Sequence, residues 1–565
     1  MLMIQILSDA LVDIEKPFRV SAGPGAGKTF WLLNHIKQVL HESKRLEKAR
    51  KIICITYTNV AAETIISRLG DVAERVEVST IHGFLYKHLL KPFLPVLEKE
   101  FELNAQEVDG HDDTILSNYS FLNDWKTQTR QHHITDDVKL AKAFRELRWK
   151  FENGNLVVKP TYQQKINGYN VKTDSYLVYK HLAWKQGITH HDDVLFFSYQ
   201  LIKKHPMVLK VLRSKFPYFF IDEFQDTNPI QIEVIREIAK QETVIGIIGD
   251  EAQSIYGFQG ADYKQFHSFT LPGLIDYQIA DNRRSTNAII KLLNVIRPAL
   301  KQNEIRKVEG SLPIIFVGTM NKAIEKAVEI SKDINVYTLS RDNMTSNVMR
   351  RHLDGTNFDD RLIAKLLEID PPTAGNKYRS KEVVGYLRAV ELAKQKQFKE
   401  AIKEAESLYP KRMDRITKRK LALSKISFLL KNYDSYKDKS AYDFFSFLKN
   451  NGSDISNMRN GAPKIFYDTN TYVQLALCVK ITEDTSLHRT IHKAKGAEFK
   501  SAMLILNEEN NIDFLLNPDL EKEEHRISYV AVSRARDNLF INVPKLSSES
   551  QKLLEPIATV NQLQN

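Results

Sequence analysis

The stretch AGPGAGKT, residues 22 to 29, constrains the fold of this chain more than any other feature. An apolar segment that reads as a strand precedes it, and apolar residues at Leu32, Ile36 and Leu40 follow it with the spacing of a helix. A glycine-rich turn from a strand into a helix is typical of α/β proteins built on a parallel sheet. The sequence therefore predicts that the first core of this chain is such a sheet.

The same turn has the chemistry of a phosphate-binding loop. Small residues allow backbone N–H groups to surround a phosphate, and the helix N-terminus adds a favourable dipole. In this setting Lys28 reaches the β- and γ-phosphates and the Thr29 hydroxyl binds Mg²⁺. A purely structural glycine turn is the alternative interpretation. The loop residues that we expect to bind ATP are Ala22, Gly23, Gly25, Ala26, Gly27, Lys28 and Thr29.

The segment FFIDEFQDTNPIQ, residues 219 to 231, is an apolar strand that ends in three carboxylates, Asp222, Glu223 and Asp226. Carboxylates gathered at the end of a buried strand repel one another unless a cation offsets their charge. We therefore expect Asp222 to hold Mg²⁺, directly or through water. We expect Glu223 to act as the general base on the water that attacks the γ-phosphate.

A third motif, GDEAQSIYGFQGA at residues 249 to 261, also follows an apolar strand. The amide of Gln253 suits a contact with the γ-phosphate. Tyr256 and Phe258 lie in a loop and suit stacking on nucleic acid bases, although an isolated aromatic residue is more often part of a core. This motif therefore predicts a link between the phosphate site and a nucleic acid.

Arginines in two further segments are candidates for contacts to the γ-phosphate. They are Arg283 and Arg284 in DNRRST, and Arg534 and Arg536 in YVAVSRARDNL. A guanidinium group stabilises the negative charge that develops on a transferring phosphoryl group. Taken singly, each arginine has the ordinary surface role as its alternative interpretation.

Strand and helix patterns alternate in two separate stretches, and long helical patterns interrupt each of them. The fold class predicted is therefore α/β, with two parallel-sheet cores that each carry a mostly helical insertion. The predicted boundaries are 1–90 and 205–275 for the first core, 91–204 for its insertion, 276–352 and 485–547 for the second core, 353–484 for its insertion, and 548–565 for a tail.

The net charge of +11 favours an anionic partner, nucleic acid first. Residues 411 to 440 contribute 10 Lys or Arg against 3 Asp, which a solvated helix face explains as well as a nucleic acid contact does. The N-terminus has no basic region of the kind that begins a signal peptide, and no run of about 20 apolar residues occurs. The expected compartment is the cytoplasm.

In content and order the motifs resemble the superfamily-one DNA helicases of the UvrD/Rep/PcrA type. The matching strings occur in family order along nearly the whole chain. They are AGPGAGKT, TYTNVAAETIISRL, STIHGFL, IDEFQDTNPIQ, GDEAQSIYGFQGA, DNRRST, TIHKAKGAEF and YVAVSRA. The resemblance implies two RecA-like motor cores, with a 1B-like insertion in the first and a short 2B-like insertion in the second.

The resemblance also implies roles for individual residues. Gln253 becomes the γ-phosphate sensor, and Arg284 and Arg534 become two arginine fingers on opposite sides of an inter-domain cleft. Gly496 and Glu498 become phosphate and ribose contacts, with Gln5 and Arg283 on the adenine side. The residues implied for the path of single-stranded DNA are Tyr57, Thr58, Asn59, Thr80, His82, Tyr256, Phe258 and His492.

Two departures from the family pattern affect function. Arg283 stands where the family often has a tyrosine that stacks on adenine, and a guanidinium plane can also stack on a base. Gln259 stands where an arginine is common, so a charge that couples ATP to DNA is missing. The size and the trimmed insertions are similar to those of compact helicases that act with separate nucleases in Gabija-type anti-phage defence.

The function expected from these observations is an ATP-dependent translocase or helicase on single-stranded DNA, with 3′→5′ direction and with ATP and Mg²⁺ as cofactors. The alternative is a regulatory ATPase subunit that senses DNA ends and signals to a nuclease, with little unwinding of its own. A third interpretation, a small-molecule kinase with a phosphate loop, explains neither TIHKAKGAEF nor YVAVSRA.

Overall fold

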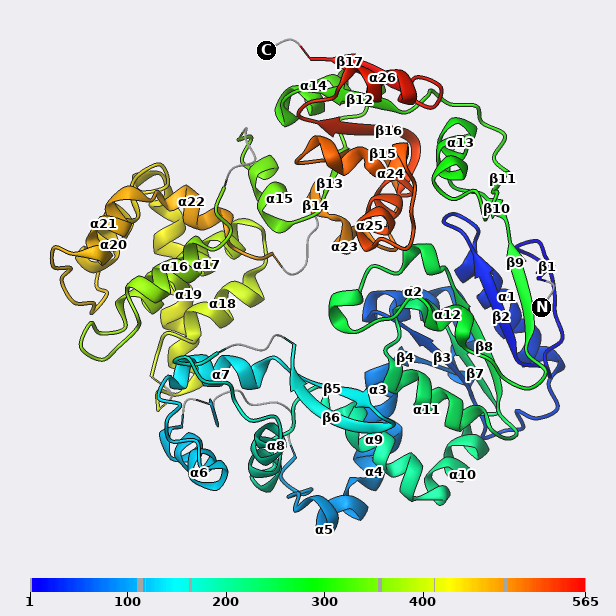
Figure 1. Ribbon diagram of the computed structural model, residues 1–565, viewed down its shortest axis with the longest axis horizontal. Coiled ribbons are helices and arrows are strands. Elements are labelled where there is room, and N and C mark those ends of the chain that lie inside the picture. The colour runs from blue at the N-terminus through cyan, green and yellow to red at the C-terminus, as the bar shows by residue number, and fades with distance from the viewer. Residues whose placement is uncertain are drawn as a thin grey trace. The chain divides into compact units, whose positions relative to one another are not determined.

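The computed structural model describes residues 3–108, 115–116, 118–161, 165–353, 358–410, 412–481 and 486–563. The chain divides into two compact units, Met1–Arg283 and Arg284–Asn565. Each unit contains one large parallel sheet with helices around it (Figure 1). The α/β fold class predicted from the sequence, with two parallel-sheet cores, is confirmed.

The sheet of the first unit has seven strands in the order β1-β9-β2-β8-β7-β3-β4, and all of its pairings are parallel. The strands are β1 (Ile4–Gln5), β2 (Phe18–Ala22), β3 (Ile52–Thr56), β4 (Val76–Thr80), β7 (Tyr218–Ile221), β8 (Val244–Gly249) and β9 (Ile275–Ile279). The central strands are buried on both faces, which is why they are continuous apolar runs in the sequence.

Helices cover both faces of this sheet, because alternate side chains of each strand point to opposite faces. In β3, Ile52 and Cys54 pack with Trp31 and Ile36 of the phosphate-loop helix. The neighbouring Ile53 belongs to the core on the other face. The helices of this core are α1 (Lys28–Glu42), α2 (Asn59–Leu69), α3 (Ile81–Leu85), α10 (Pro206–Lys215), α11 (Pro229–Ala239) and α12 (Gln265–Ser268).

The first insertion shares its hydrophobic core with one face of the sheet, since Trp125, Phe144 and Trp184 cluster with Ile53 and Phe219. Its helices are α4 (Lys91–Phe93), α5 (Glu98–Phe101), α6 (Tyr119–Thr129), α7 (Asp137–Arg145), α8 (Ser175–Lys185) and α9 (Asp193–Lys204), and a hairpin joins β5 (Leu147–Glu152) to β6 (Asn155–Pro160).

This hairpin departs from the mostly helical pattern predicted for residues 91–204, because only the first half of DDVKLAKAFRELRWKFENG, residues 136 to 154, forms a helix. The helix α7 ends at Arg145, and Leu147 and Trp149 are buried while Arg148 and Lys150 are exposed. That alternation is the period of a strand. Asn153 and Gly154 both have positive φ values, 49° and 80°, as a tight hairpin turn requires.

The sheet of the second unit has six strands in the order β14-β13-β15-β16-β12-β17, again all parallel. The strands are β12 (Ile314–Val317), β13 (Val336–Ser340), β14 (His488–Thr490), β15 (Phe499–Ile505), β16 (Ala535–Val543) and β17 (Thr559–Gln562). The helices of this core are α13 (Asn287–Ile296), α14 (Met320–Ser331), α15 (Asn343–Arg350), α23 (Ile491–Ala494), α24 (Asp513–Leu516), α25 (Glu523–Val532) and α26 (Ser548–Leu554).

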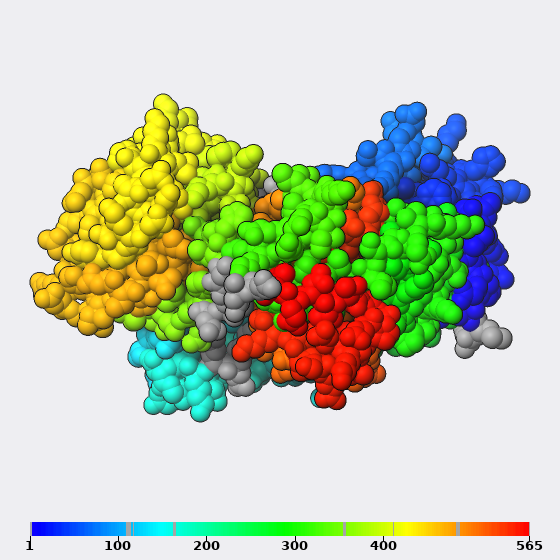
Figure 2. Space-filling model, turned by 90° about the horizontal axis from the view of Figure 1, so that it is seen from above, coloured from blue at the N-terminus to red at the C-terminus, as the bar shows by residue number. Residues whose placement is uncertain are grey.

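The second insertion has a hydrophobic core of its own, from Leu362 to Ile481. In Figure 2 its helices form the yellow and orange lobe. Arg351, next to α15, forms an ion pair with Glu391 of the insertion. The helices are α16 (Leu362–Ile369), α17 (Arg379–Lys394), α18 (Phe398–Glu406), α19 (Arg415–Lys431), α20 (Ala441–Asn450), α21 (Ala462–Thr469) and α22 (Tyr472–Leu477). The predicted end of this insertion at 484 and Lys411 of its basic stretch lie outside the described residues.

Two boundaries differ from those expected. The first core does not end at residue 275, because β9 pairs with β2 and the chain leaves the first unit only after Arg283. The described part of the predicted tail, residues 548–563, belongs to the second core, because β17 pairs with β12 and extends the second sheet. No helix in the described part of the chain is long and apolar enough to span a membrane.

Candidate functional site

The candidate site of the first unit lies along one edge of its sheet. In a parallel sheet the carboxyl ends of all strands meet at the same edge, where ligands of α/β proteins bind. The phosphate loop follows β2, Asp222 follows β7, and Asp250 follows β8. Tyr57 follows β3 and Ile81 follows β4 at that edge as well. Motifs far apart in the sequence are therefore brought to one edge by strand order alone.

The phosphate loop has the backbone of an anion-binding turn. Gly25 and Gly27 adopt left-handed conformations, with φ values of 73° and 80°, which glycine reaches at little cost. Lys28 Nζ donates a 3.1 Å hydrogen bond to the carbonyl of Ala22, which holds the ammonium over the loop. Both Lys28 and Thr29 begin α1, where the helix dipole favours negative charge.

The two carboxylates after β7 are held in an unusual arrangement. Asp222 is 6% exposed, and its Oδ1 accepts a 3.0 Å hydrogen bond from the backbone N–H of Glu223. Burial raises the pKa of Asp222, and so does the neighbouring Glu223, while Lys28 opposes the rise. Glu223 has a φ of 54°, a left-handed conformation that is strained for a residue with a side chain. Strain of this kind is concentrated at functional sites.

These features fit a magnesium ion bound with a nucleotide. In the described part of the chain no group of three or more His, Cys, Asp or Glu side chains could hold a metal by itself. Mg²⁺ is typically held by one or two protein oxygens together with phosphate oxygens and water. Asp222 and Thr29 would supply those protein ligands. A cation there would offset both the cost of burying the charge of Asp222 and its repulsion with Glu223.

Gln225 is a site residue that the sequence analysis did not identify. It is fully buried, and its side-chain amide donates to the carboxylate of Glu223 while its Oε1 accepts a 3.0 Å hydrogen bond from the N–H of Asp250. In turn, Gln253 Nε2 donates a 2.5 Å hydrogen bond to Asp250. Glu223, the predicted base, and Gln253, the predicted sensor, are thus linked by hydrogen bonds through two intervening residues, Gln225 and Asp250.

Arg283 lies against the phosphate loop. Its backbone N–H donates a 2.9 Å hydrogen bond to the carbonyl of Gly25, and its Nε donates a 2.8 Å hydrogen bond to the hydroxyl of Ser8. Ser8 is fully buried, and no sequence signal pointed to it. Gln5, predicted on the adenine side, lies in the edge strand β1 and donates to Gln278. Its role in ATP binding stays a prediction.

The residues predicted for DNA include an aromatic pair at the ends of β3 and β8. The rings of Tyr57 and Tyr256 stack with 4.6 Å between centroids and 22° between planes. The hydroxyl of Tyr57 donates a 2.6 Å hydrogen bond to Oε1 of Gln259. Tyr256 is 9% exposed, whereas Phe258 is 61% exposed. Phe258 is therefore the ring best placed to receive a base.

A second pair of rings joins the segment after β4 to the first insertion. His82 stacks on His191 with 4.1 Å between ring centroids, and burial together with His191 lowers the pKa of His82 to about 3. The hydroxyls of Thr58 and Thr80 accept hydrogen bonds from backbone N–H groups and cap α2 and α3. Asn59 is the first residue of α2, and His492 lies in α23 of the second unit. Their contacts with DNA stay predictions.

Both predicted arginine fingers lie in the second unit and converge on one turn, which corrects the expectation that they stand on opposite sides of a cleft. Arg284 Nε lies 2.9 Å from Glu498, and its NH1 donates a 3.0 Å hydrogen bond to the carbonyl of Ser533. Arg534 donates to the hydroxyl of the same serine at 2.9 Å and to the carbonyl of Ala497 at 3.4 Å. Gly496, one residue before Ala497, has a φ of 84° and room around its Cα.

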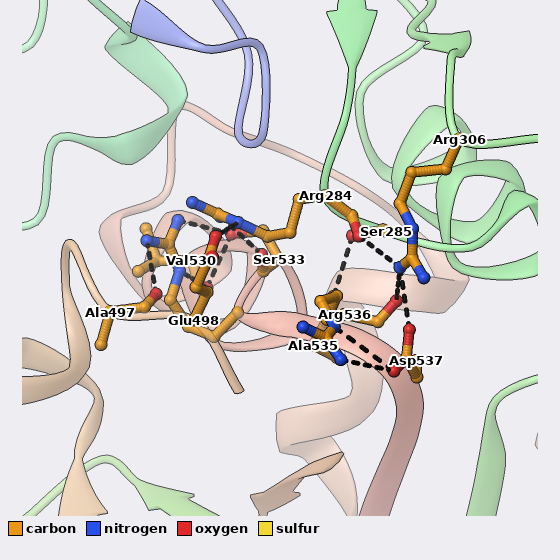
Figure 3. Close-up of polar contacts among 11 residues, drawn as sticks. Arg284, Ser285, Arg306, Ala497, Glu498, Val530, Ser533, Ala535, Arg536 and Asp537 are labelled. Carbon is orange, nitrogen blue, oxygen red and sulfur yellow. Dashed lines mark hydrogen bonds and ion pairs between the residues drawn. The ribbon is translucent and has the colours of Figure 1, made fainter. Parts of the chain in front are cut away.

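Arg536 has a different partner from this pair, the carboxylate of Asp537 (Figure 3). Its guanidinium group forms an ion pair with Asp537 at 3.1 Å. Arg306 donates a 2.8 Å hydrogen bond to the same carboxylate and also bonds the carbonyls of Arg284 and Arg536. Arg306 thus braces the backbone and Arg536 pairs with Asp537, while the guanidinium groups of Arg284 and Arg534 gather at Ser533.

Comparison with known proteins yields two family models in tandem. The UvrD/REP helicase N-terminal domain matches residues 5–271. The UvrD-like helicase C-terminal domain matches residues 274–545. The boundary between the two matches falls close to the division of the structure after Arg283.

Similar proteins include Gabija protein GajB of Bacillus cereus (strain HuB5-5), 28% identical over 331 residues that cover 51% of this chain and 48% of that protein. A probable DNA helicase II homolog of Mycoplasma capricolum is 26% identical over 64% of this chain and 49% of its own length. The ATP-dependent DNA helicase PcrA of Staphylococcus aureus is 27% identical over 54% of this chain and 40% of its own length. The matched part of this chain thus spans about half of these relatives or less. Because the two family models together match nearly all of it, the chain belongs to the UvrD/Rep-like helicases.

Proposed function

We propose that this protein is an ATP-driven motor that moves along single-stranded DNA in the 3′→5′ direction and separates duplex DNA ahead of it. The observation that carries the proposal is the shared sheet edge of the first unit. It brings the phosphate loop, the pair of Asp222 and Glu223, and the segment with Gln253 and Phe258 to the ends of neighbouring strands. One edge thus holds groups for nucleotide chemistry and an exposed ring suited to a base.

The residues divide the work as follows. Lys28 and the loop N–H groups bind the phosphates, and Glu223 takes a proton from the attacking water. Mg²⁺, held by Asp222 and Thr29 with the phosphates, neutralises charge on the transferring group. Gln253 contacts the γ-phosphate, and Arg284 and Arg534 stabilise its charge during turnover. Arg283 contributes to the adenine side, and Gly496 and Glu498 to the phosphate and the ribose.

The test begins with ATP hydrolysis by the purified chain. We expect Mg²⁺-dependent hydrolysis that single-stranded DNA stimulates. Lys28→Ala should abolish turnover, because it removes the charge that compensates the phosphates. Glu223→Gln should retain ATP binding and lose hydrolysis, because an amide does not accept the proton of water. Hydrolysis by Glu223→Gln at the wild-type rate would show that Glu223 is not the base.

Unwinding is tested with duplexes that carry a single-stranded tail at either the 3′ or the 5′ end. A 3′→5′ motor separates the 3′-tailed duplex with ATP and leaves the 5′-tailed duplex intact. Equal separation of both, or separation without ATP, would contradict the proposed directed motor. DNA binding should weaken with salt, because Lys and Arg release counterions from the phosphate backbone.

A second candidate function is a regulatory ATPase that senses DNA ends and acts with a separate nuclease in antiviral defence. The similarity to Gabija protein GajB over half of the chain favours it. So does Gln259, whose side chain bonds Tyr57 where many relatives carry a charge. For this function, the purified chain would hydrolyse ATP in response to DNA ends and fail to separate either tailed duplex.

A further inference from the structure

We propose that Gln225 is a positioning residue that ties the catalytic base to the segment 249–254, so that DNA binding at Phe258, which follows this segment, changes the rate of ATP hydrolysis. The inference rests on the proposed function, because it concerns the same hydrolysis. It adds a residue and a physical route between two motifs that are otherwise separate along the chain.

Three polar groups of Gln225 each make a different contact. Its amide N–H donates to the carboxylate of Glu223, and its amide oxygen accepts from the N–H of Asp250 at 3.0 Å. Its backbone carbonyl accepts a 3.0 Å hydrogen bond from the hydroxyl of Ser254. A fully buried amide held on both sides has little freedom to rotate, so a shift of one neighbour moves the other.

The conformation of Glu223 explains why such a brace is needed. Its φ of 54° is unfavourable for a residue with a side chain, so the base does not hold its place by backbone preference. The donated hydrogen bond from Gln225 fixes the direction of the carboxylate. A general base has to lie within hydrogen-bond reach of the water it activates, and small displacements cost rate.

The space around Gln225 is closed by a glycine. A Cβ atom at Gly249, the last residue of β8, would overlap the amide oxygen of Gln225 and lie 2.9 Å from the ring of Phe266. A side chain 24 positions away therefore requires glycine at this position. The backbone does not require it, because Gly249 has no positive φ. This close approach places the amide against the start of the 249–254 segment.

The other end of the route is exposed to solvent. Asp250 accepts hydrogen bonds from Gln253 and from the N–H of Ala252. The segment then continues to Tyr256, whose ring stacks on Tyr57, and to the exposed Phe258. A base that stacks on Phe258 pulls on this segment, and the amide of Gln225 carries the shift to Glu223.

The test compares Gln225→Leu with Thr227→Val. Thr227 is buried in the same turn, and its hydroxyl bonds the carbonyl of Phe224, so the control also loses one local hydrogen bond. For Gln225→Leu we expect kcat with single-stranded DNA to fall about a hundredfold, and the ratio of DNA-stimulated to basal rate to fall towards one. The KM for ATP and the affinities for ADP and single-stranded DNA should stay within about twofold of wild type.

Gly249→Ala gives an independent check, since it displaces the Gln225 amide without altering its chemistry. It should reproduce the loss of kcat and of DNA stimulation. Gln225→Glu keeps an oxygen for the N–H of Asp250 but faces Glu223 with a second carboxylate, so its kcat should fall as well. If thermal melting shows that Gln225→Leu does not fold, these two variants carry the same comparison.

The outcomes separate this inference from the function on which it rests. A wild-type chain without DNA-stimulated hydrolysis would overturn the proposed function. A wild-type chain with that activity, together with folded Gln225 and Gly249 variants that behave like Thr227→Val, would overturn the role of Gln225 alone. So would a parallel loss of ADP affinity in these variants, because that pattern reports a collapsed site and not a misplaced base.

Discussion

The hydroxyl of Tyr57 donates a hydrogen bond to the amide oxygen of Gln259, and the ring of Tyr57 stacks on that of Tyr256. Tyr57 follows β3 and the other two residues follow β8, so this contact joins the ends of two strands of one sheet. A neutral amide accepts the phenol hydrogen here. Gln259 thereby orders the aromatic pair without adding positive charge, and Phe258 is left as the exposed ring beside it.

Phe258→Ala should weaken binding of single-stranded DNA by about 1–3 kcal/mol, the usual contribution of one stacked base. Nucleotide affinity should hardly change, because Phe258 is exposed and lies outside the phosphate loop. Tyr119→Ala is the control, since Tyr119 is also an exposed aromatic residue of the first unit. Fluorescence anisotropy with a labelled oligonucleotide measures both. Equal affinities for the two variants would remove Phe258 from the DNA path.

Arg284→Ala and Arg534→Ala should each lower kcat about 10³-fold with saturating single-stranded DNA, the scale of an arginine that stabilises a transferring phosphoryl group. The affinity for ADP should change little, because ADP lacks the phosphate being contacted. Arg536→Ala is the matched control, since Arg536 is paired with Asp537. Because Arg534 is only 2% exposed, the melting temperature of the Arg534→Ala variant has to be measured in parallel. Similar, mild effects on kcat at all three positions would contradict the role of Arg284 and Arg534 as arginine fingers.

His35 predicts a loss of stability in mild acid. Its ring is buried among Trp31, Phe18 and Phe220, and burial lowers its pKa to about 4, which Gln38 opposes. Below a pH of about 6.5, His35 binds a proton in the unfolded chain but stays neutral in the folded chain. The free energy of unfolding therefore falls as the pH drops towards 4. The loss attributable to His35 is about 3 kcal/mol.

His35→Leu should remove this part of the acid sensitivity, while His41→Gln, at the exposed end of the same helix, should leave it in place. The measurement is the free energy of unfolding of the first unit, obtained by denaturant titration at several pH values between 7 and 4.5. A stability curve of His35→Leu that keeps the wild-type slope would contradict the assignment.

The first insertion should depend on one buried ion pair. Lys180 Nζ lies 2.8 Å from Asp193, with side chains 2% and 1% exposed, and the indole N–H groups of Trp149 and Trp184 also donate to this carboxylate. Lys180→Met leaves a buried charge without its counter-ion and should cost about 3–5 kcal/mol of unfolding free energy. Lys185 lies on the same helix and forms an exposed pair with Glu102, so Lys185→Met should cost far less. Equal costs would show that the buried pair adds nothing.

Features that depend on local pattern can be read from the amino-acid sequence alone. The phosphate loop needs glycines at several positions of a turn between a strand and a helix, and AGPGAGKT supplies them at alternate positions within eight residues. Buried strands of a parallel sheet have to be apolar on both faces, so β3, β7 and β8 were recognisable as uninterrupted apolar runs. The motif order was sufficient to indicate the family.

The partner that faces a given side chain, in contrast, is known only from the folded structure. The contact of Gln225 with Asp250 and that of Arg283 with Ser8 join residues 25 and 275 positions apart, and no periodicity records such a distance. The predicted boundaries did not include β9 in the first core or β17 in the second sheet for the same reason. A strand at the end of a domain is identified by the strand with which it pairs. Helix and strand patterns follow from each residue's near neighbours, whereas sheet order and buried hydrogen bonds follow from packing of the whole chain.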